Sequence, residues 1–152
     1  MGIFYQSLIT AVLFGAHNNG EMLRVIKLQK AAARIILDKT YRDRSEDMFE
    51  DLGWQQIENR IRDKRLVMVY NSLNGKTPSY ITDMFTTLDK IHTHSLRSTT
   101  ACNVFLEGGR TDYHKKRFSY LAAKEWNQLP RNVKEVITLY TFEHIIKSIT
   151  KA

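Results

Sequence analysis

The chain has 152 residues, of which 43% are hydrophobic and 26% are charged. This length fits one domain, and this composition excludes a disordered chain. The single cysteine excludes an internal disulfide and is typical of a reducing compartment, so we expect an intracellular protein, nuclear or cytoplasmic and not secreted. The net charge of +7 favours an anionic partner such as nucleic acid or a membrane surface.

The first 20 residues, MGIFYQSLITAVLFGAHNNG, carry no charged side chain. No basic residue precedes the apolar run, as one would in a signal peptide. Gln6, Ser7 and Thr10 interrupt the run and make it a poor membrane span, so we expect no membrane partner. Residues 1–16 are therefore expected to form an apolar helix that is buried on most of its surface and needs a cover.

The rest of the chain reads as helices joined by short loops, because glycine and proline are few. Asn19 is expected to cap the first long helix, and Gly53 and Gly75 are expected to end later ones. The predicted helices cover residues 21–38, 45–52, 55–73, 78–85 and 113–128, with two shorter helices near Val133 and over 142–149.

Residues 86–112 break this pattern. They are rich in threonine, serine and glycine, and they contain one strand-like run, CNVFLE. The predicted fold is therefore mainly α, a single multi-helix domain over residues 1–152 with an irregular, partly extended segment around 86–112.

The stretch RVIKLQKAAARIIL, residues 24–37, carries only basic charges. At 100° per residue its four cations fall within an arc of about 120°. These cations are Arg24, Lys27, Lys30 and Arg34, and the opposite side is expected to pack through Leu28, Ala32, Ile35 and Ile36. The basic side is either a solvated surface or a strip that contacts a polyanion.

Two further basic clusters follow. Residues 54–77 have a net charge of +3, and Arg60 and Lys64 share a helix face from which Arg62 and Arg65 point away. Residues 113–134 have a net charge of +5 and place aromatic side chains among the basic residues Lys115, Lys116, Arg117 and Lys124. Such aromatics could stack on bases, although Phe118 and Trp126 are expected in the core. Between the basic segments, residues 41–53 have a net charge of −3.

No pattern predicts catalysis, a metal site or a cofactor. His92, His94, Cys102 and His114 match no usual zinc spacing, and Gly108-Gly109 is a lone turn signal. The acidic residues Glu46, Asp47, Glu50 and Asp51 fit the first turn and solvated face of a helix.

Five segments, in this order, resemble the carboxy-terminal region of non-LTR retrotransposon reverse transcriptases of the LINE-type, jockey-like group. They are LQKAAARIIL, LGW, LVMVYNSLNGKTPSYITDMF, LRSTT and KKRFSYLAAKEWNQLP, and the resemblance extends over about residues 1–150. Where family members carry a Trp-Gly pair before the Leu-Gln-Lys helix, this chain has Phe14-Gly15.

The resemblance implies a thumb-like and post-thumb region that holds template and primer, cut from a larger polyprotein. The Phe/Tyr-x-Asp-Asp tetrapeptide of the polymerase is absent from the sequence, so no catalytic residue is carried over and this chain is not expected to be an enzyme. The apolar helix over 1–16 would pack on the missing palm.

The sequence therefore predicts a non-catalytic region that binds nucleic acid, RNA or an RNA–DNA hybrid, through its phosphates and without sequence preference. Two alternatives stay open: an adaptor that binds another protein through residues 1–16, and a decayed element without function. The residues expected in the core are Ile26, Ala32, Ile36, Ile61, Leu66, Tyr70, Leu73, Leu121 and Trp126.

Overall fold

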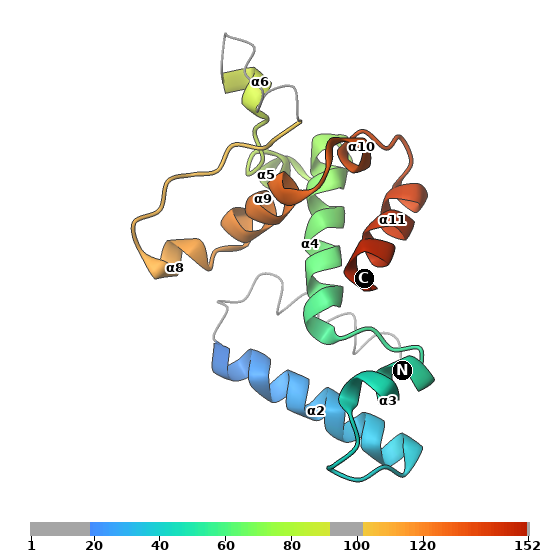
Figure 1. Cartoon of the computed structure of the whole chain (residues 1–152). Helices are drawn as coiled ribbons and strands as arrows, with labels where there is room; N and C mark the ends of the chain where they lie inside the picture. Colours follow the sequence, from blue (N-terminus) through green and yellow to red (C-terminus); the bar gives the residue numbers. More distant parts are fainter. Residues whose placement is uncertain (1–18, 92–101, 152) are drawn as a thin grey trace.

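The computed structural model describes residues 19–91 and 102–151, and these are mostly helical, which confirms the predicted mainly-α class (Figure 1). The helices are α2 (Asn19–Leu37), α3 (Ser45–Asp51), α4 (Ile57–Leu73), α5 (Ser79–Thr82), α6 (Leu88–Ile91), α8 (Asp112–Lys115), α9 (Phe118–Gln128), α10 (Arg131–Lys134) and α11 (Leu139–Lys151). The helix expected over residues 1–16 lies outside the described residues. No described helix is both long and apolar enough to span a membrane.

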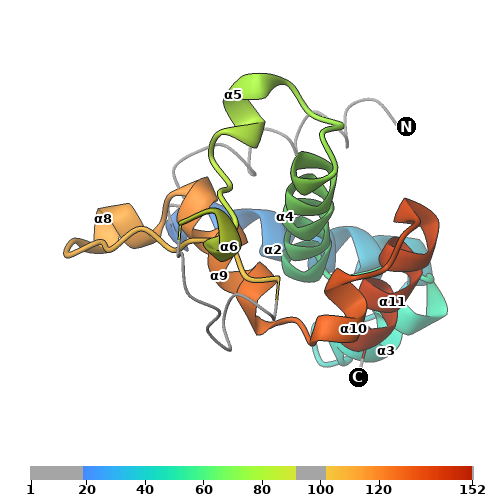
Figure 2. The ribbon, with the colours of Figure 1, turned by 90° about the horizontal axis from the view of Figure 1, so that it is seen from above.

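Helix α4 stands at the centre of the structure, with α9 and α11 packed on different sides of it (Figures 1 and 2). The largest core cluster lies among these three helices. Its aromatic centre is Phe142 of α11, which stacks on Tyr70 at 4.6 Å between ring centroids and lies 5.8 Å from Trp126. All three side chains are at most 1% exposed, so they lie fully within the core.

Polar side chains on α4 are buried together with its apolar ones. Arg65 Nε donates a hydrogen bond to Glu125 of α9 at 2.8 Å, and the two side chains form an ion pair. Asp63 accepts hydrogen bonds from Gln55 Nε2 at 2.6 Å and from the Thr150 hydroxyl of α11 at 3.1 Å. These bonds tie α9 and α11 to α4.

Helix α2 packs through a different face from the one that its sequence suggested. Met22, Val25 and Ile26 lie against Ile57 and Ile61 at the start of α4. Farther along, the fully buried Ala33 packs on Met48 and Phe49 of α3.

Gln29 lies at the centre of this packing face and links α2 to the loop before α4. Its Nε2 donates to the Gln55 carbonyl at 2.9 Å, and its Oε1 accepts from the Ile57 amide at 3.0 Å. The prediction that Leu28, Ala32, Ile35 and Ile36 form the packing face is therefore wrong for the three large residues, which are 69%, 81% and 57% exposed. The face that packs carries apolar residues of its own together with Gln29, so it combines apolar burial with two hydrogen bonds to the segment that begins α4.

The expected core residues fall into three groups. Ile61, Leu66, Tyr70 and Trp126 are buried as predicted. Ile26, Ala32, Leu73 and Leu121 are half-buried, and Ile36 is exposed, in contradiction of the prediction.

The helix predicted over 113–128 is broken in two. Arg117 takes an extended conformation (φ −63°, ψ 145°) at the N-cap position just before α9. Thr111 caps the short α8 by accepting a hydrogen bond from the His114 amide at 3.2 Å. The break lets Phe118 turn into the core while the three cations before it stay exposed. No glycine or proline marks this break in the sequence.

The irregular segment behaves as predicted in its described parts. Thr87 and Val104 form an isolated antiparallel bridge, and Asn127 of α9 binds the backbone N–H and C=O of Val104 at 2.9 and 2.8 Å. The one-turn helix α6 was not predicted. Residues 92–101 lie outside the described residues.

We expect Ala33→Leu to destabilise the fold by about 1–3 kcal/mol, because three additional carbons must enter a filled space between α2 and α3. Ala31→Leu on the exposed side of the same helix is the matched control and should leave stability nearly unchanged. Urea unfolding followed by circular dichroism measures both, and equal stability of the two variants would contradict the packing face described above.

We expect Glu125→Gln to lower the free energy of unfolding by about 3 kcal/mol, because the buried Arg65 guanidinium would lose its counter-charge. Glu135→Gln removes one partner of an exposed pair with Arg131, and its unfolding midpoint should match that of the unaltered protein. Thermal unfolding of both variants gives the comparison, and a Glu125→Gln variant as stable as its control would refute it.

Candidate nucleic-acid interface

The first half of the α2 strip is exposed to solvent. Arg24 and Lys27 are exposed, and neither has an acidic partner within 4 Å among the described side chains. Met22, Val25 and Ile26 hold this part of α2 on α4, so the helix presents both cations outward from a fixed base. Unpaired, exposed cations on a rigid helix are suited to phosphate contact.

The second half of the strip is in a different environment. Lys30 and Arg34 are half-buried, and the guanidinium carbon of Arg34 lies 4.8 Å from the centroid of the Tyr41 ring. Helix α3 and the loop before it bring acidic groups close to both, among them Asp43 and Glu46. The four cations therefore form a continuous strip on α2, but its two halves differ in their exposure to solvent and in their neighbours.

The pKa values of those two acids report this proximity. The Thr40 backbone amide, at 2.6 Å, and then its hydroxyl lower the pKa of Asp43, with smaller contributions from Lys39 and Arg34. A backbone hydrogen bond within Glu46 and the Ser45 hydroxyl lower the pKa of Glu46, with Lys30 contributing less. Lys30 and Arg34, like Arg24 and Lys27, have no acidic partner within 4 Å among the described side chains, and they differ from them in being half-buried.

The α8–α9 junction carries the next cluster. Lys115, Lys116 and Arg117 are all exposed, as is Lys124 farther along α9. Lys115 lies 3.5 Å from Asp112, and Arg117 lies 3.7 Å from Glu107, which are solvent-exposed pairs of small energetic value. Lys116 and Lys124 have no acidic partner within 4 Å in the described parts of the chain.

The structure brings the open half of the α2 strip and the α8–α9 junction to the same end of α4. Phe118, directly after the three cations, packs on Ile57 and Ile61, the residues that also receive α2. Figures 1 and 2 both show α8 and the first turns of α2 on the same side of α4. Segments about 90 residues apart in sequence therefore contribute to one basic surface, defined here as Arg24, Lys27, Lys115, Lys116 and Arg117.

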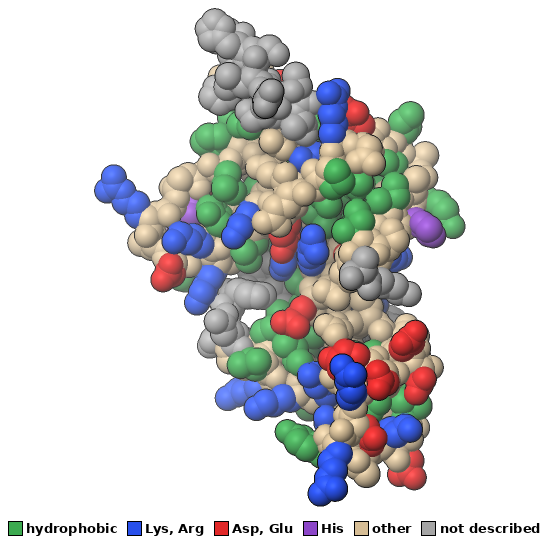
Figure 3. Space-filling view, in the orientation of Figure 1, with side chains coloured by type: hydrophobic (Ala, Val, Ile, Leu, Met, Phe, Trp, Pro, Cys, Tyr) green, Lys and Arg blue, Asp and Glu red, His purple; other side chains and the backbone are tan. Residues whose placement is uncertain are grey.

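The space-filling view shows basic and acidic side chains concentrated over different helices. Lys and Arg side chains gather over α8 and the first turns of α2, whereas Asp and Glu gather over α3 (Figure 3). On the face shown, a polyanion would therefore be attracted more strongly to the region of α8 and the first turns of α2 than to α3.

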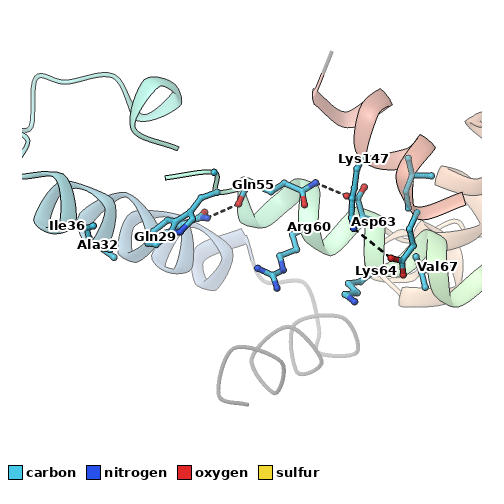
Figure 4. A pocket seen from close by; sticks show the side chains of 13 residues that line it. Gln29, Ala32, Ile36, Gln55, Arg60, Asp63, Lys64, Val67 and Lys147 are labelled. Carbon is cyan, nitrogen blue, oxygen red and sulfur yellow. Dashed lines mark hydrogen bonds and ion pairs between the residues drawn. The ribbon is translucent and has the colours of Figure 1, made fainter. Parts of the chain in front are cut away.

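Arg60 and Lys64 lie outside the basic surface. They share a face of α4, as predicted, and line a cleft of ≈ 850 Å³ between α2, α4 and α11 (Figure 4). The cleft borders Ala32 and Ile36, which lie about 140° and 180° around α2 from Lys27. The structure thus separates Arg60 and Lys64 from the basic surface.

Lys147 of α11 also lines this cleft, 3.7 Å from Glu143, and sequence reasoning did not single it out. Nothing in the local sequence places Lys147 near Lys64, because α11 comes to lie beside α4 only through tertiary packing. Arg65 is engaged in the buried pair with Glu125, and Arg62 does not line the cleft, which confirms that neither joins Arg60 and Lys64.

The described residues hold no group of three His, Cys, Asp or Glu side chains that could bind a metal ion. Cys102 donates a weak hydrogen bond to Glu135 at 3.8 Å, and His114 lies beside Glu107. These two of the four residues considered as zinc ligands therefore have different partners. His92 and His94 lie outside the described residues. The acidic residues of α3 are exposed on its outer side, as expected for a solvated face.

Comparison of the chain with protein-family models, with curated proteins and with solved structures found no match.

Proposed function

We propose that this chain binds nucleic acid through phosphate contacts on its basic surface and has no catalytic role of its own. The observation that carries the proposal is the common anchoring of α2 and the α8–α9 junction on Ile57 and Ile61. That anchoring fixes five exposed cations at one end of α4. Contacts of this kind position a duplex without reading its bases, so binding should tolerate any sequence.

The resemblance to the carboxy-terminal region of mobile-element reverse transcriptases supports the same proposal. A thumb-like region holds the backbones of template and primer, and an RNA–DNA hybrid is then the natural ligand. The two halves of the α2 strip differ in exposure: Arg24 and Lys27 are exposed and contribute most, whereas Lys30 and Arg34 are half-buried and contribute less.

We expect Arg24→Gln with Lys27→Gln to reduce the log–log salt slope of hybrid binding by about 2, because two released counterions are lost at about 0.9 each. Lys30→Gln with Arg34→Gln should reduce it by less than about 1. Affinity should fall alike for unrelated sequences. Fluorescence anisotropy at several salt concentrations measures the slopes, and circular dichroism checks that α2 survives, since glutamine forms helices about as well as lysine.

A matched control removes the same charge at the other end of α4. Lys76 and Arg131 are exposed, and replacing both by glutamine should leave the slope within about 0.5 of the original value. If this control lowers the slope as much as the Arg24 and Lys27 pair does, binding follows net charge and the assigned surface is wrong.

We further expect no primer extension on an RNA template by the purified chain. Two-metal phosphoryl transfer needs clustered inward-facing carboxylates, whereas the acidic residues of α3 are spread over an exposed helix face. The measurement is extension of a labelled primer with Mg²⁺ and all four deoxynucleotides. Primer-extension activity that co-purifies with the chain, and is lost when the chain is removed, would contradict the proposal.

A second function, protein interaction, is favoured by a different observation. Helix α2 exposes Leu28, Ile35 and Ile36 beside its basic strip, and a phosphate backbone gives such side chains nothing to pack against.

A further inference from the structure

One exposed aromatic side chain lies among the cations of the basic surface. The tyrosines that are exposed in the described parts of the chain are Tyr41, Tyr80, Tyr113 and Tyr140. The guanidinium of Arg34 lies over the Tyr41 ring, and Tyr80 and Tyr140 belong to α5 and α11 near the other end of α4. Tyr113 belongs to α8, is 75% exposed, and contacts no other described ring or cation.

The neighbouring His114 fixes the position of α8. Its ring meets the ring of Tyr120 in α9 edge-on, at 5.7 Å between ring centroids. It also lies against Gly109, where a Cβ atom would collide with the imidazole. The His114 side chain is only 20% exposed, and its backbone amide is bound by Thr111. These contacts turn His114 inward, so Tyr113, one residue earlier and about 100° around the helical turn, is held facing solvent.

Lys116 lies on the same side of α8 as Tyr113. Its amide donates a hydrogen bond to the Tyr113 carbonyl at 3.2 Å, and its backbone is helical (φ −89°, ψ −7°). Residues three apart in such a turn have Cβ atoms about 5–6 Å from each other. Lys115 pairs with Asp112, whereas Lys116 has no acidic partner within 4 Å among the described side chains. An open aromatic ring and an available ammonium group therefore lie side by side.

This pairing of groups suits an unpaired nucleotide. Proteins bind single strands by stacking bases on aromatic rings while cations contact the phosphates between them. A base inside a duplex is covered on both faces by its neighbours, so it has no face to offer to Tyr113. Helix α2 contains no aromatic residue, so its cations contact phosphates without distinguishing paired from unpaired nucleotides.

We propose that the basic surface binds nucleic acid at a junction between duplex and single strand. The Tyr113 ring stacks on an unpaired base, and Lys116 contacts the phosphate next to that base. Arg24 and Lys27 of α2 contact the backbone of the duplex. This inference rests on the proposed function and names the class of nucleic acid that the surface prefers.

Two ligands that differ only in their unpaired bases test the proposal. One is an RNA–DNA hybrid with a few unpaired nucleotides at each end, and the other is the same hybrid with abasic sites at those positions. Both present the same phosphates. Fluorescence anisotropy should give the full-length chain a Kd about tenfold lower for the ligand that has the bases, because stacking of one base supplies the difference.

The variants assign this difference to one ring. Tyr113→Ala should abolish it and change the Kd for a blunt hybrid by less than about twofold. Tyr113→Phe should keep it, because stacking needs the ring and not the hydroxyl. Tyr140→Ala removes a ring that is 81% exposed on α11 and should also keep it. Circular dichroism and the urea midpoint establish that each variant is folded.

Equal affinity of the unaltered chain for the two ligands would overturn this proposal and leave phosphate binding intact. A difference that survives in Tyr113→Ala would overturn it too, because another group would then hold the base. So would a loss in Tyr113→Phe as large as in Tyr113→Ala, because the hydroxyl would then be the contact. If the chain binds neither ligand nor the blunt hybrid, the proposed function fails together with this inference.

Discussion

The structure depends on one constraint: α4 is covered by other elements around most of its circumference. Polar side chains of a helix in this position cannot be hydrated, and a buried polar group without a hydrogen-bond partner costs about 1–3 kcal/mol of stability. Three of the buried polar groups of α4 take partners from three different neighbours. Arg65 takes Glu125 of α9, Asp63 takes Thr150 of α11, and the Ile57 amide takes Gln29 of α2. The bonds that satisfy α4 are the same bonds that fix how the surrounding helices are placed.

Much of the helical content could be predicted because its signals are local. Gly53 and Gly75 end helices in the left-handed conformation, with φ of 61° and 66°, as their sequence positions indicated. The orientation of α2 could not be predicted in the same way. Its surface offers a basic side and two sides with apolar residues. The side that packs contains Gln29, whose partners are the Gln55 carbonyl and the amide of Ile57, the first residue of α4, and both lie far away in the sequence. The break at Arg117 was also hidden, because tertiary packing of Phe118 causes it.

The environment of the candidate interface residues could likewise be predicted only in part. The exposure of Arg24, Lys27 and the cations before Phe118 could be predicted, because isolated charged side chains seldom enter a core unpaired. The neighbours of Lys30 and Arg34 could not, because the net negative charge of residues 41–53 says nothing of where that segment folds back. Only the packing of Met48 and Phe49 on Ala33 brings those acids beside the strip. Likewise, Arg60 and Lys64 share a helix face as predicted, but α11 decides that this face borders a cleft.

Phe118 packs on both the main core and the smaller cluster at the start of α4, and its ring meets Phe85 edge-on at 6.0 Å. By contrast, the cluster of Ala33, Met48 and Phe49 shares no described residue with the main core. The helical pair α2–α3 is therefore joined to the assembly of α4, α9 and α11 through the smaller cluster at the start of α4 and through the hydrogen bonds of Gln29. Because α2 and α3 contribute no residue to the main core, we expect their amide protons to exchange with solvent at a lower free-energy cost than those of α4. The basic surface spans that junction, and a ligand bound to both sides of it couples the helical pair to the assembly.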